Sequence, residues 1–191
     1  DGLLVYNTKT KTVNSILTQP DVKHLNAEIN IQRVSLTPHA GFFAGGNSAI
    51  YQLHPGQNKF NIYKSYNDLT RVVKNSSEIF LSSSCYDNNR KGYWMTFYNH
   101  NGVVFYDENL KTQHPFGVSK KDTWMDDIAV DGKGRVLAVS KEGNLYVLNE
   151  QLRQFELEKS ISNNITGNSL NEIENDNQGN IWLAGRTSVY H

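Results

Sequence analysis

Short apolar runs, each only a few residues long, recur along the chain and are separated by polar turn residues. The clearest case is a phrase in which an Asp/Gly turn stands between two apolar runs, found at 130–138 and again with the same layout at 175–183. Short runs of β-favouring residues bounded by Gly, Asn and Asp indicate antiparallel strands joined by tight turns. The pattern therefore predicts an all-β protein.

A second phrase consists of a small residue followed by several apolar residues, usually ending in Asn or Asp. It recurs at intervals of 42 to 53 residues, at positions 2–7, 49–54, 102–107, 144–149 and 188–190. A unit of about 40 to 50 residues with about four short strands is typical of a β-propeller blade. One such sheet cannot bury both of its faces, so the units are expected to stack around an axis.

We therefore expect residues 1–191 to form a β-propeller segment of about four blades, each a four-stranded antiparallel sheet. The chain begins at the third strand of one blade and ends at the third strand of another, so we expect a segment cut from a larger ring. Its open ends would expose apolar sheet faces, to be covered by other blades or by a second protomer. The expected blade boundaries are 1–32, 33–76, 77–125, 126–168 and 169–191.

Composition narrows the possible functions. The net charge is zero, which argues against nucleic-acid binding because that needs a basic face. No apolar run approaches the roughly 20 residues of a membrane span. The single Cys85 excludes an internal disulfide and is expected to be a buried, inert thiol. Because the chain starts at Asp1 rather than Met, we expect a trimmed segment from which any export signal has been removed.

The stretch Asp-Asn-Gln-Gly-Asn-Ile-Trp-Leu-Ala-Gly at 176–185 resembles the two-component-regulator propeller repeat, and 2–10 resembles its second half. Other units depart from the pattern: Leu137 stands where the last unit has Trp182, and Trp94 follows Gly92 by two positions rather than three. The resemblance implies the periplasmic sensor region of a hybrid two-component histidine kinase of Bacteroidetes. It also implies oligosaccharide ligands, with a membrane helix and a kinase in other parts of the parent chain.

The sequence contains no recognisable catalytic or metal motif. It lacks the Gly-x-Ser-x-Gly, His-Glu-x-x-His and P-loop patterns, and its six histidines are scattered. The turn at 175–179 resembles the start of a calcium loop, but Arg186 stands where that loop needs Glu. We therefore expect no cofactor, no metal and no catalysis. The alternatives are a propeller enzyme acting on glycans, as a lyase or hydrolase, or a protein-interaction scaffold.

The candidate ligand-binding residues are Trp124, Asp126 and Asp127, in a polar loop that enters a first strand. A ring there can stack on the apolar face of a sugar while carboxylates accept hydroxyl hydrogen bonds. The structural alternatives are that Trp124 tucks onto the blade edge and that the two aspartates satisfy backbone N–H groups. We expect Trp94 and Trp182 to pack between blades. Ile181 and Trp182 are expected in the second strand of the last blade, with one or both of them buried. A longer polar hairpin is expected at 85–91, as a contact surface or a tolerated loop.

Overall fold

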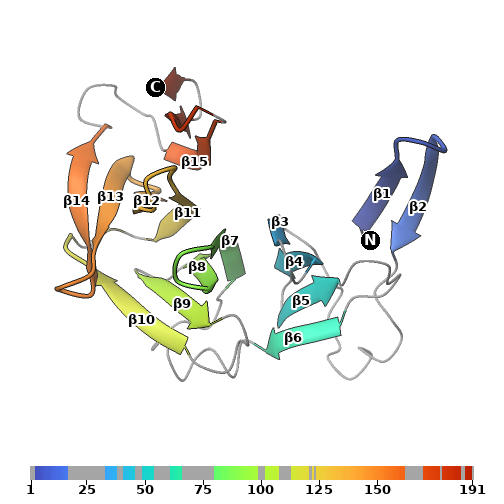
Figure 1. Ribbon diagram of the computed structural model, residues 1–191, viewed down its shortest axis with the longest axis horizontal. Coiled ribbons are helices and arrows are strands. Elements are labelled where there is room, and N and C mark those ends of the chain that lie inside the picture. The colour runs from blue at the N-terminus through green and yellow to red at the C-terminus, as the bar shows by residue number, and fades with distance from the viewer. Residues whose placement is uncertain are drawn as a thin grey trace. The chain divides into compact units, whose positions relative to one another are not determined.

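The computed structural model (Figure 1) describes thirteen stretches of the chain and places strands in most of them. The described stretches are 3–16, 33–37, 41–45, 49–53, 61–65, 80–98, 102–107, 113–120, 122, 124–161, 170–176, 178–185 and 188–190. Every regular element in them is a β-strand, and they contain no helix suited to crossing a membrane. The chain divides into two compact units, Asp1–Asn75 and Ser76–His191.

The first unit contains a two-stranded hairpin and a four-stranded antiparallel sheet. The hairpin pairs β1 (Leu3–Asn7) with β2 (Thr12–Ile16). The sheet has the order β3-β4-β5-β6, and its strands are β3 (Arg33–Thr37), β4 (Gly41–Gly45), β5 (Ala49–Leu53) and β6 (Asn61–Ser65). Each strand pairs with the next one in sequence, which is the meander expected from the closely spaced turn residues.

The second unit contains three successive antiparallel sheets. The first consists of β7 (Phe80–Asp87), β8 (Gly92–Tyr98), β9 (Val103–Asp107) and β10 (Gln113–Val118). The second consists of β11 (Met125–Val130), β12 (Val136–Ser140), β13 (Asn144–Asn149) and β14 (Gln154–Ser160). The third consists of β15 (Leu170–Asn175), β16 (Ile181–Gly185) and β17 (Val189–Tyr190).

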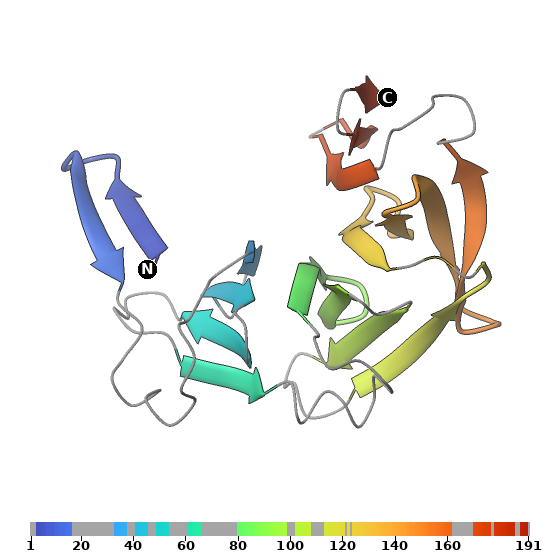
Figure 2. The same cartoon turned by 180° about the vertical axis from the view of Figure 1, so that it is seen from behind.

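These sheets stack as propeller blades do. Strand β11 packs against β7 and β8 of the sheet before it and against β15 of the sheet after it. At the outer edge β10 and β14 come together (Figure 2). They form a short parallel pair, with Val118 opposite Phe155. The prediction of an all-β propeller segment built from four-stranded antiparallel sheets is therefore confirmed.

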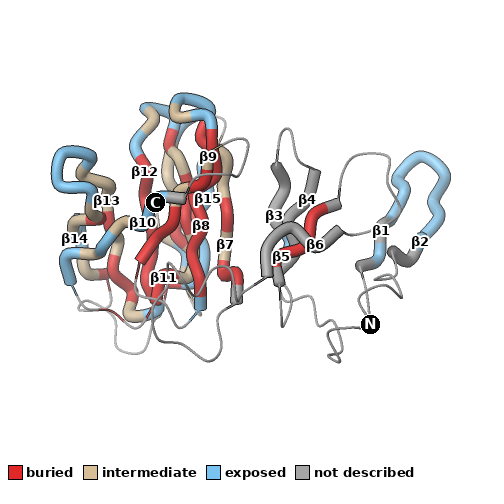
Figure 3. Tube along the Cα trace, turned by 90° about the horizontal axis from the view of Figure 1, so that it is seen from below, coloured by how far each residue is buried: buried red, intermediate tan, exposed pale blue. Residues whose placement is uncertain are grey.

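Strand β12 shows why the blades must stack, since all of its residues are buried (Figure 3). Successive side chains of a strand point to opposite faces. Val136 and Ala138 accordingly join one apolar cluster, which also contains Trp94 and Phe155, while Leu137 and Val139 join a second. Each cluster fills the space between two neighbouring sheets, so the sheet β11–β14 supplies apolar residues to both.

The last sheet partly corrects the sequence prediction. Ile181 and Trp182 do lie in its second strand, β16, as expected. However, Trp182 is 40% exposed and Ile181 is half-buried, so the expected burial is wrong. Trp94 by contrast is only 1% exposed, because Phe155 of the following sheet packs against it. Trp182 belongs to the last sheet that the structure describes.

Candidate ligand-binding site

Trp124, the main residue of the predicted ligand site, is buried beside the start of β11. Its side chain is 6% exposed, with the Tyr98 ring centroid 4.3 Å away and the Lys141 ammonium 3.9 Å from its own centroid. Its indole nitrogen donates a 2.7 Å hydrogen bond to Asp126 Oδ1. This arrangement matches the alternative in which Trp124 tucks onto the blade edge. Stacking of a sugar needs an open ring face, which Trp124 does not present in this arrangement. Ligand contact at Trp124 therefore stays a prediction.

Asp127 ties two blades together. Its Oδ1 accepts a 2.8 Å hydrogen bond from the Ile128 amide, and its Oδ2 accepts one of 2.9 Å from the Ile173 amide in β15. Burial and then the nearby Asp127 charge raise the pKa of Glu174, on the same strand as Ile173. Asp127 therefore satisfies backbone donors, the role given as its alternative.

A buried polar network lies behind Trp124, and sequence reasoning missed it. Asp122 Oδ2 accepts hydrogen bonds of 2.8 Å from Asn144 Nδ2 and 2.5 Å from the Tyr146 hydroxyl. Ser160 donates a further 2.6 Å bond to Asn144 Oδ1. Burial and then the Asp122 hydrogen bond raise the pKa of Tyr146, so its phenol stays a donor. The network fixes the loop before β11 to two strands of its own blade, and its members have no shared motif in the sequence.

At the opposite end of the strands, the first hairpin of each of the three sheets in Ser76–His191 is built on one aspartate. The carboxylates of Asp87, Asp131 and Asp176 each use Oδ1 to accept two backbone N–H groups of the following turn, at 2.8 to 3.0 Å. Such Asx turns are a usual way for Asp to close a tight connection. The Oδ2 atoms of Asp87 and Asp176 accept the indole N–H groups of Trp94 and Trp182, both at 2.9 Å.

The three turns align on a residue with left-handed backbone. Lys91 (φ 52°), Gly134 (φ 80°) and Gly179 (φ 83°) have this conformation. Each stands three positions before a β-strand residue: Trp94, Leu137 and Trp182 respectively. The repeat that contains Trp94 therefore does not depart from the spacing of the last repeat, because Lys91 rather than Gly92 is the counterpart of Gly179. In the repeat that contains Leu137, whose side chain has no N–H group, the Arg135 side chain donates to Asp131 Oδ2 at 2.7 Å instead.

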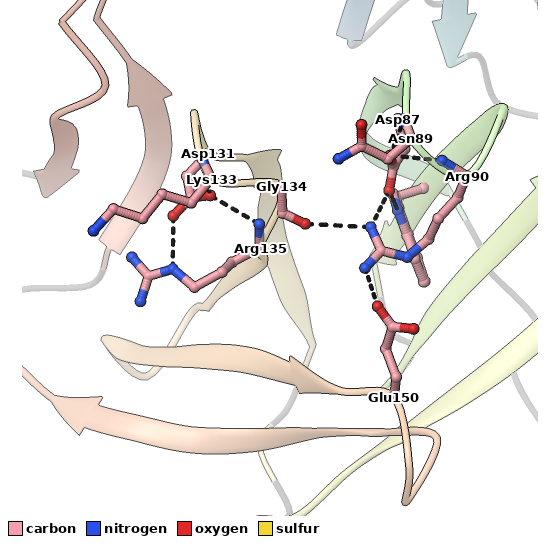
Figure 4. Close-up of polar contacts among 9 residues, drawn as sticks. Asp87, Asn89, Arg90, Asp131, Lys133, Gly134, Arg135 and Glu150 are labelled. Atoms are coloured by element: carbon pink, nitrogen blue, oxygen red, sulfur yellow. Dashed lines mark hydrogen bonds and ion pairs between the residues drawn. The ribbon is translucent and has the colours of Figure 1, made fainter.

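Arg90 connects the first and second of these hairpins (Figure 4). One guanidinium nitrogen donates to Asp87 Oδ2 at 2.5 Å and to the Gly134 carbonyl at 3.3 Å, and the other contacts Glu150. Burial alone would raise the pKa of Asp87, but hydrogen bonds from Trp94 and Arg90 outweigh it and lower that pKa. The structure also shortens the expected hairpin at 85–91, because β7 continues to Asp87 and only 88–91 form the turn.

A polar pocket of about 310 Å³ lies between these two hairpins, and we call it the hairpin pocket. Residues 86–89 and 130–134 line it. The side chains of Asn88, Asn89 and Lys133 are exposed there, and none has a hydrogen bond to the described part of the chain. Two amides and an ammonium provide both donors and acceptors for a ligand rich in hydroxyl groups. No signal in the sequence singled out this pocket, because it depends on two hairpins 44 residues apart.

The described residues show no arrangement of His, Cys, Asp or Glu side chains that could hold a metal ion. Among the histidines His114 is described and is exposed, while His24, His39, His54, His100 and His191 lie outside the described residues, as does Arg186. Cys85 is half-buried, and burial and then the charges of Asp127 and Asp87 raise the pKa of its thiol. A raised pKa keeps the thiol protonated and unreactive.

No known domain family and no curated protein matches this sequence. Solved structures do share its fold. The extracellular domain of BT4673 from B. thetaiotaomicron, described as a one-component system and elsewhere as a hybrid two-component system, superposes with a TM-score of 0.72 at 22% identity. That of BT3049, a hybrid two-component system of the same organism, gives 0.70 at 16%, and YCF48 bound to D1 peptide gives 0.64 at 13%.

These superpositions cover nearly all of this chain but only part of each neighbour. They include 99% of the chain for BT4673, 97% for BT3049 and 94% for YCF48. The chain spans about a quarter of either B. thetaiotaomicron domain, 24% in both cases, and 53% of YCF48. At these identities the comparison shows a shared propeller-type fold, in agreement with the stacked sheets described above.

Proposed function

We propose that this chain is a non-catalytic, ligand-binding propeller segment from the extracytoplasmic sensor region of a hybrid two-component signalling protein. The observation that carries the proposal is the superposition of nearly the whole chain on two such extracellular domains. The repeat at 176–185 points the same way. On this proposal the segment lies in the periplasm, and the membrane anchor and kinase belong to other parts of the parent protein.

The proposed ligand is an oligosaccharide. The hairpin pocket supports this because its amide and ammonium groups suit sugar hydroxyls and its volume falls in the range of small-molecule sites. A second proposed contact is the rim carrying Trp124, Asp126 and Asp127. There the exposed Lys141 side chain covers the buried Trp124 ring through a cation–π contact. Such a contact contributes about 0.5 kcal/mol at exposed sites and about 2 kcal/mol where it is desolvated. Displacement of that flexible side chain by a sugar would open one ring face at a cost within this range.

The hairpin carboxylates support a role without catalysis. General acid catalysis at neutral pH needs a carboxyl group whose pKa is raised. The pKa values of Asp87 and Asp131 are lowered instead, since hydrogen bonds from Trp94, Arg90 and Arg135 outweigh the effect of burial. Both groups are therefore ionised and already bound to donors of the protein, which suits them to structure rather than to acid–base chemistry.

A second candidate function is protein or peptide recognition. One structural neighbour, YCF48, was solved bound to a peptide, the D1 peptide. A scaffold of this kind would bind an extended peptide through the same exposed hairpins, without responding to sugars. Binding of peptides but not of oligosaccharides would favour this function over the first.

Titration of the protein with a panel of oligosaccharides, followed by calorimetry, tests the proposed function. We expect at least one sugar to bind, and Lys133→Ala combined with Asn88→Ala to weaken it about tenfold, as the loss of hydrogen bonds from one site predicts. Lys159→Ala is the matched control, because Lys159 is an exposed lysine on β14 outside the pocket. Unchanged affinity in the pocket variant would move the site elsewhere, and absence of any sugar binding would contradict the oligosaccharide proposal.

A further inference from the structure

A second pocket, of about 330 Å³, is lined in part by Arg90, and we call it the ring pocket. Its apolar wall consists of Trp94, Phe105, Phe116 and Leu148, contributed by the facing sheets β7–β10 and β11–β14. Charged side chains stand beside these rings, among them Arg90, Glu150 and Arg153. The ring pocket thus differs in chemistry from the polar hairpin pocket.

The rings of this wall form one packed group. The Trp94 centroid lies 4.7 Å from that of Phe105 and 5.0 Å from that of Phe116, in tilted and edge-on geometries. Trp94 itself is buried, whereas Phe105 and Phe116 are half-buried and so keep part of their surface open. Offset and edge-on arrangements are those that aromatic rings prefer, and a further ring can add to such a group.

The two arginines beside the rings differ in whether their charge is paired with a carboxylate of the described residues. Arg90 lies over Trp94, 5.9 Å from its centroid, and its charge is matched by Asp87 and Glu150. Arg153 lies over Phe116 at 5.3 Å and forms no ion pair with any described residue. Its guanidinium therefore keeps its full set of donors at the pocket, in a fork that matches a carboxylate.

The backbone around Arg153 holds it in place. It occupies a left-handed position (φ 51°) in the turn before β14. That turn is closed by hydrogen bonds from the Leu152 amide to Asn149 Oδ1 at 3.2 Å and from the Arg153 amide to the Glu150 carbonyl at 3.3 Å. The turn thus fixes the backbone of Arg153 beside the rings, and its exposed side chain keeps its charge available.

We propose that the ring pocket binds a six-membered ring that carries a carboxylate. The ring packs on Phe105 and Phe116, and the carboxylate accepts hydrogen bonds from Arg153, an interaction that is often bidentate and about twice as strong as a neutral one. The volume is sufficient for one such ring. A uronic acid and an aromatic acid share this chemistry, so the site is defined by the ring and its charge. The inference goes beyond the proposed function and does not require the sensor role.

Four small probes test the site, with tryptophan fluorescence and calorimetry as readouts. Benzoate and glucuronate carry the carboxylate, while benzyl alcohol and methyl glucoside are their neutral counterparts. We expect at least one of the two carboxylates to bind about tenfold or more tightly than its neutral counterpart, as a charge-assisted hydrogen bond predicts. Preference for benzoate or for glucuronate then identifies the source of the ring. Equal affinity within both pairs, or no binding of either carboxylate, would overturn the proposal.

Variant proteins test whether the carboxylate binds to Arg153. Lys91 is a matched control because it is an exposed cation with nearly the same left-handed backbone (φ 52°) and lies outside the pocket. Arg153→Gln should reduce carboxylate affinity about tenfold and leave the neutral probes unchanged, whereas Lys91→Gln should change neither. Phe116→Leu should weaken charged and neutral rings alike. Equal effects of Arg153→Gln and Lys91→Gln on carboxylate binding would contradict the assignment.

Discussion

Trp94 and Asp87 are joined by a 2.9 Å hydrogen bond from the indole nitrogen to Oδ2, and both side chains are buried where two blades meet. The same bond, also 2.9 Å, joins Trp182 to Asp176 in the last described sheet. There the tryptophan is 40% exposed rather than 1%. One local arrangement, a strand end with its Asx turn and a tryptophan from the next strand, thus occurs in two environments. Within the described residues, a following sheet covers Trp94 but not Trp182.

Replacement of the two tryptophans separates local from inter-blade stabilisation. Trp94→Ala removes a buried ring together with its hydrogen bond and should cost about 3 to 5 kcal/mol in the free energy of unfolding. Trp182→Ala should cost less than half as much, because its ring is partly in solvent already. Urea unfolding measures both. Equal losses would mean that the blade facing Trp94 adds nothing to its stabilisation.

Acid should destabilise the protein through the hairpin aspartates. The folded-state pKa values of Asp87 and Asp131 are lowered below the ordinary value of about 3.9. Their contribution is therefore fully present above about pH 4 and is lost as the pH falls through the folded-state values. The free energy of unfolding, measured from pH 6 downwards, should fall below about pH 4, and Asp87→Asn should make this fall shallower.

Glu174 provides the opposite control for the pH series. Its folded-state pKa is raised, so its contribution is present below its unfolded pKa of about 4.3 and disappears as the pH rises through the folded-state value. Glu174→Gln should therefore make the acid destabilisation steeper than in the parent protein. Parallel pH curves for the parent, Asp87→Asn and Glu174→Gln would contradict these roles.

Arg90 should matter more for stability than the glutamate it contacts. Arg90→Ala leaves the buried Asp87 carboxylate without its ionic partner. Loss of one partner from a buried ion pair costs about 3 kcal/mol. The cost here should be somewhat smaller, because Asp87 keeps other donors such as the Trp94 indole. Glu150 is 65% exposed, and Glu150→Ala should cost under about 1 kcal/mol. Thermal unfolding of both variants tests this order. A larger loss for Glu150→Ala would contradict this order. It would mean that Arg90 stabilises the protein mainly through its contact with Glu150 on the neighbouring blade.

Substitution of three glycines by alanine separates the cost of steric overlap from the cost of an unfavourable backbone conformation. A Cβ at Gly92 would lie 2.2 Å from the Tyr106 carbonyl oxygen and 2.3 Å from the Phe105 ring, so Gly92→Ala should cost about 1 to 3 kcal/mol or more. Gly179 has open space but a φ of 83°, and Gly179→Ala should cost about 1 kcal/mol. Gly117 has open space around it, and Gly117→Ala should be neutral. Melting temperatures that place Gly117→Ala below Gly92→Ala would refute this packing.

The strands and the repeat could be predicted from sequence because short β-favouring runs and turn residues are local signals. The alignment of the repeat that contains Trp94 with the last repeat could not be predicted. The left-handed position there is occupied by Lys91, where Gly is the usual choice, while the neighbouring Gly92 is required by the closeness of Tyr106 and Phe105. The sequence therefore placed Trp94 one position out of step with Trp182, although both bind the same kind of aspartate.

The candidate site was harder to predict because it depends on contacts between distant elements. The exposure of Trp124 is set by Tyr98 from β8 and Lys141 from the turn after β12, which nothing in its own loop reveals. Asp127 binds Ile173, 46 positions away in the chain. Both pockets likewise form only where hairpins of neighbouring blades meet, so residue types alone did not indicate them.

Saturation-transfer NMR on a panel of oligosaccharides, followed over time with the protein present, tests the proposed role as a propeller segment that binds a ligand without transforming it. The single experiment reports both contact with the protein and the chemical integrity of each sugar. We expect saturation transfer to at least one oligosaccharide, with all of its signals unchanged after prolonged incubation. New reducing-end or unsaturated-sugar signals would reveal a hydrolase or lyase, and absence of transfer to every sugar would contradict the oligosaccharide sensor.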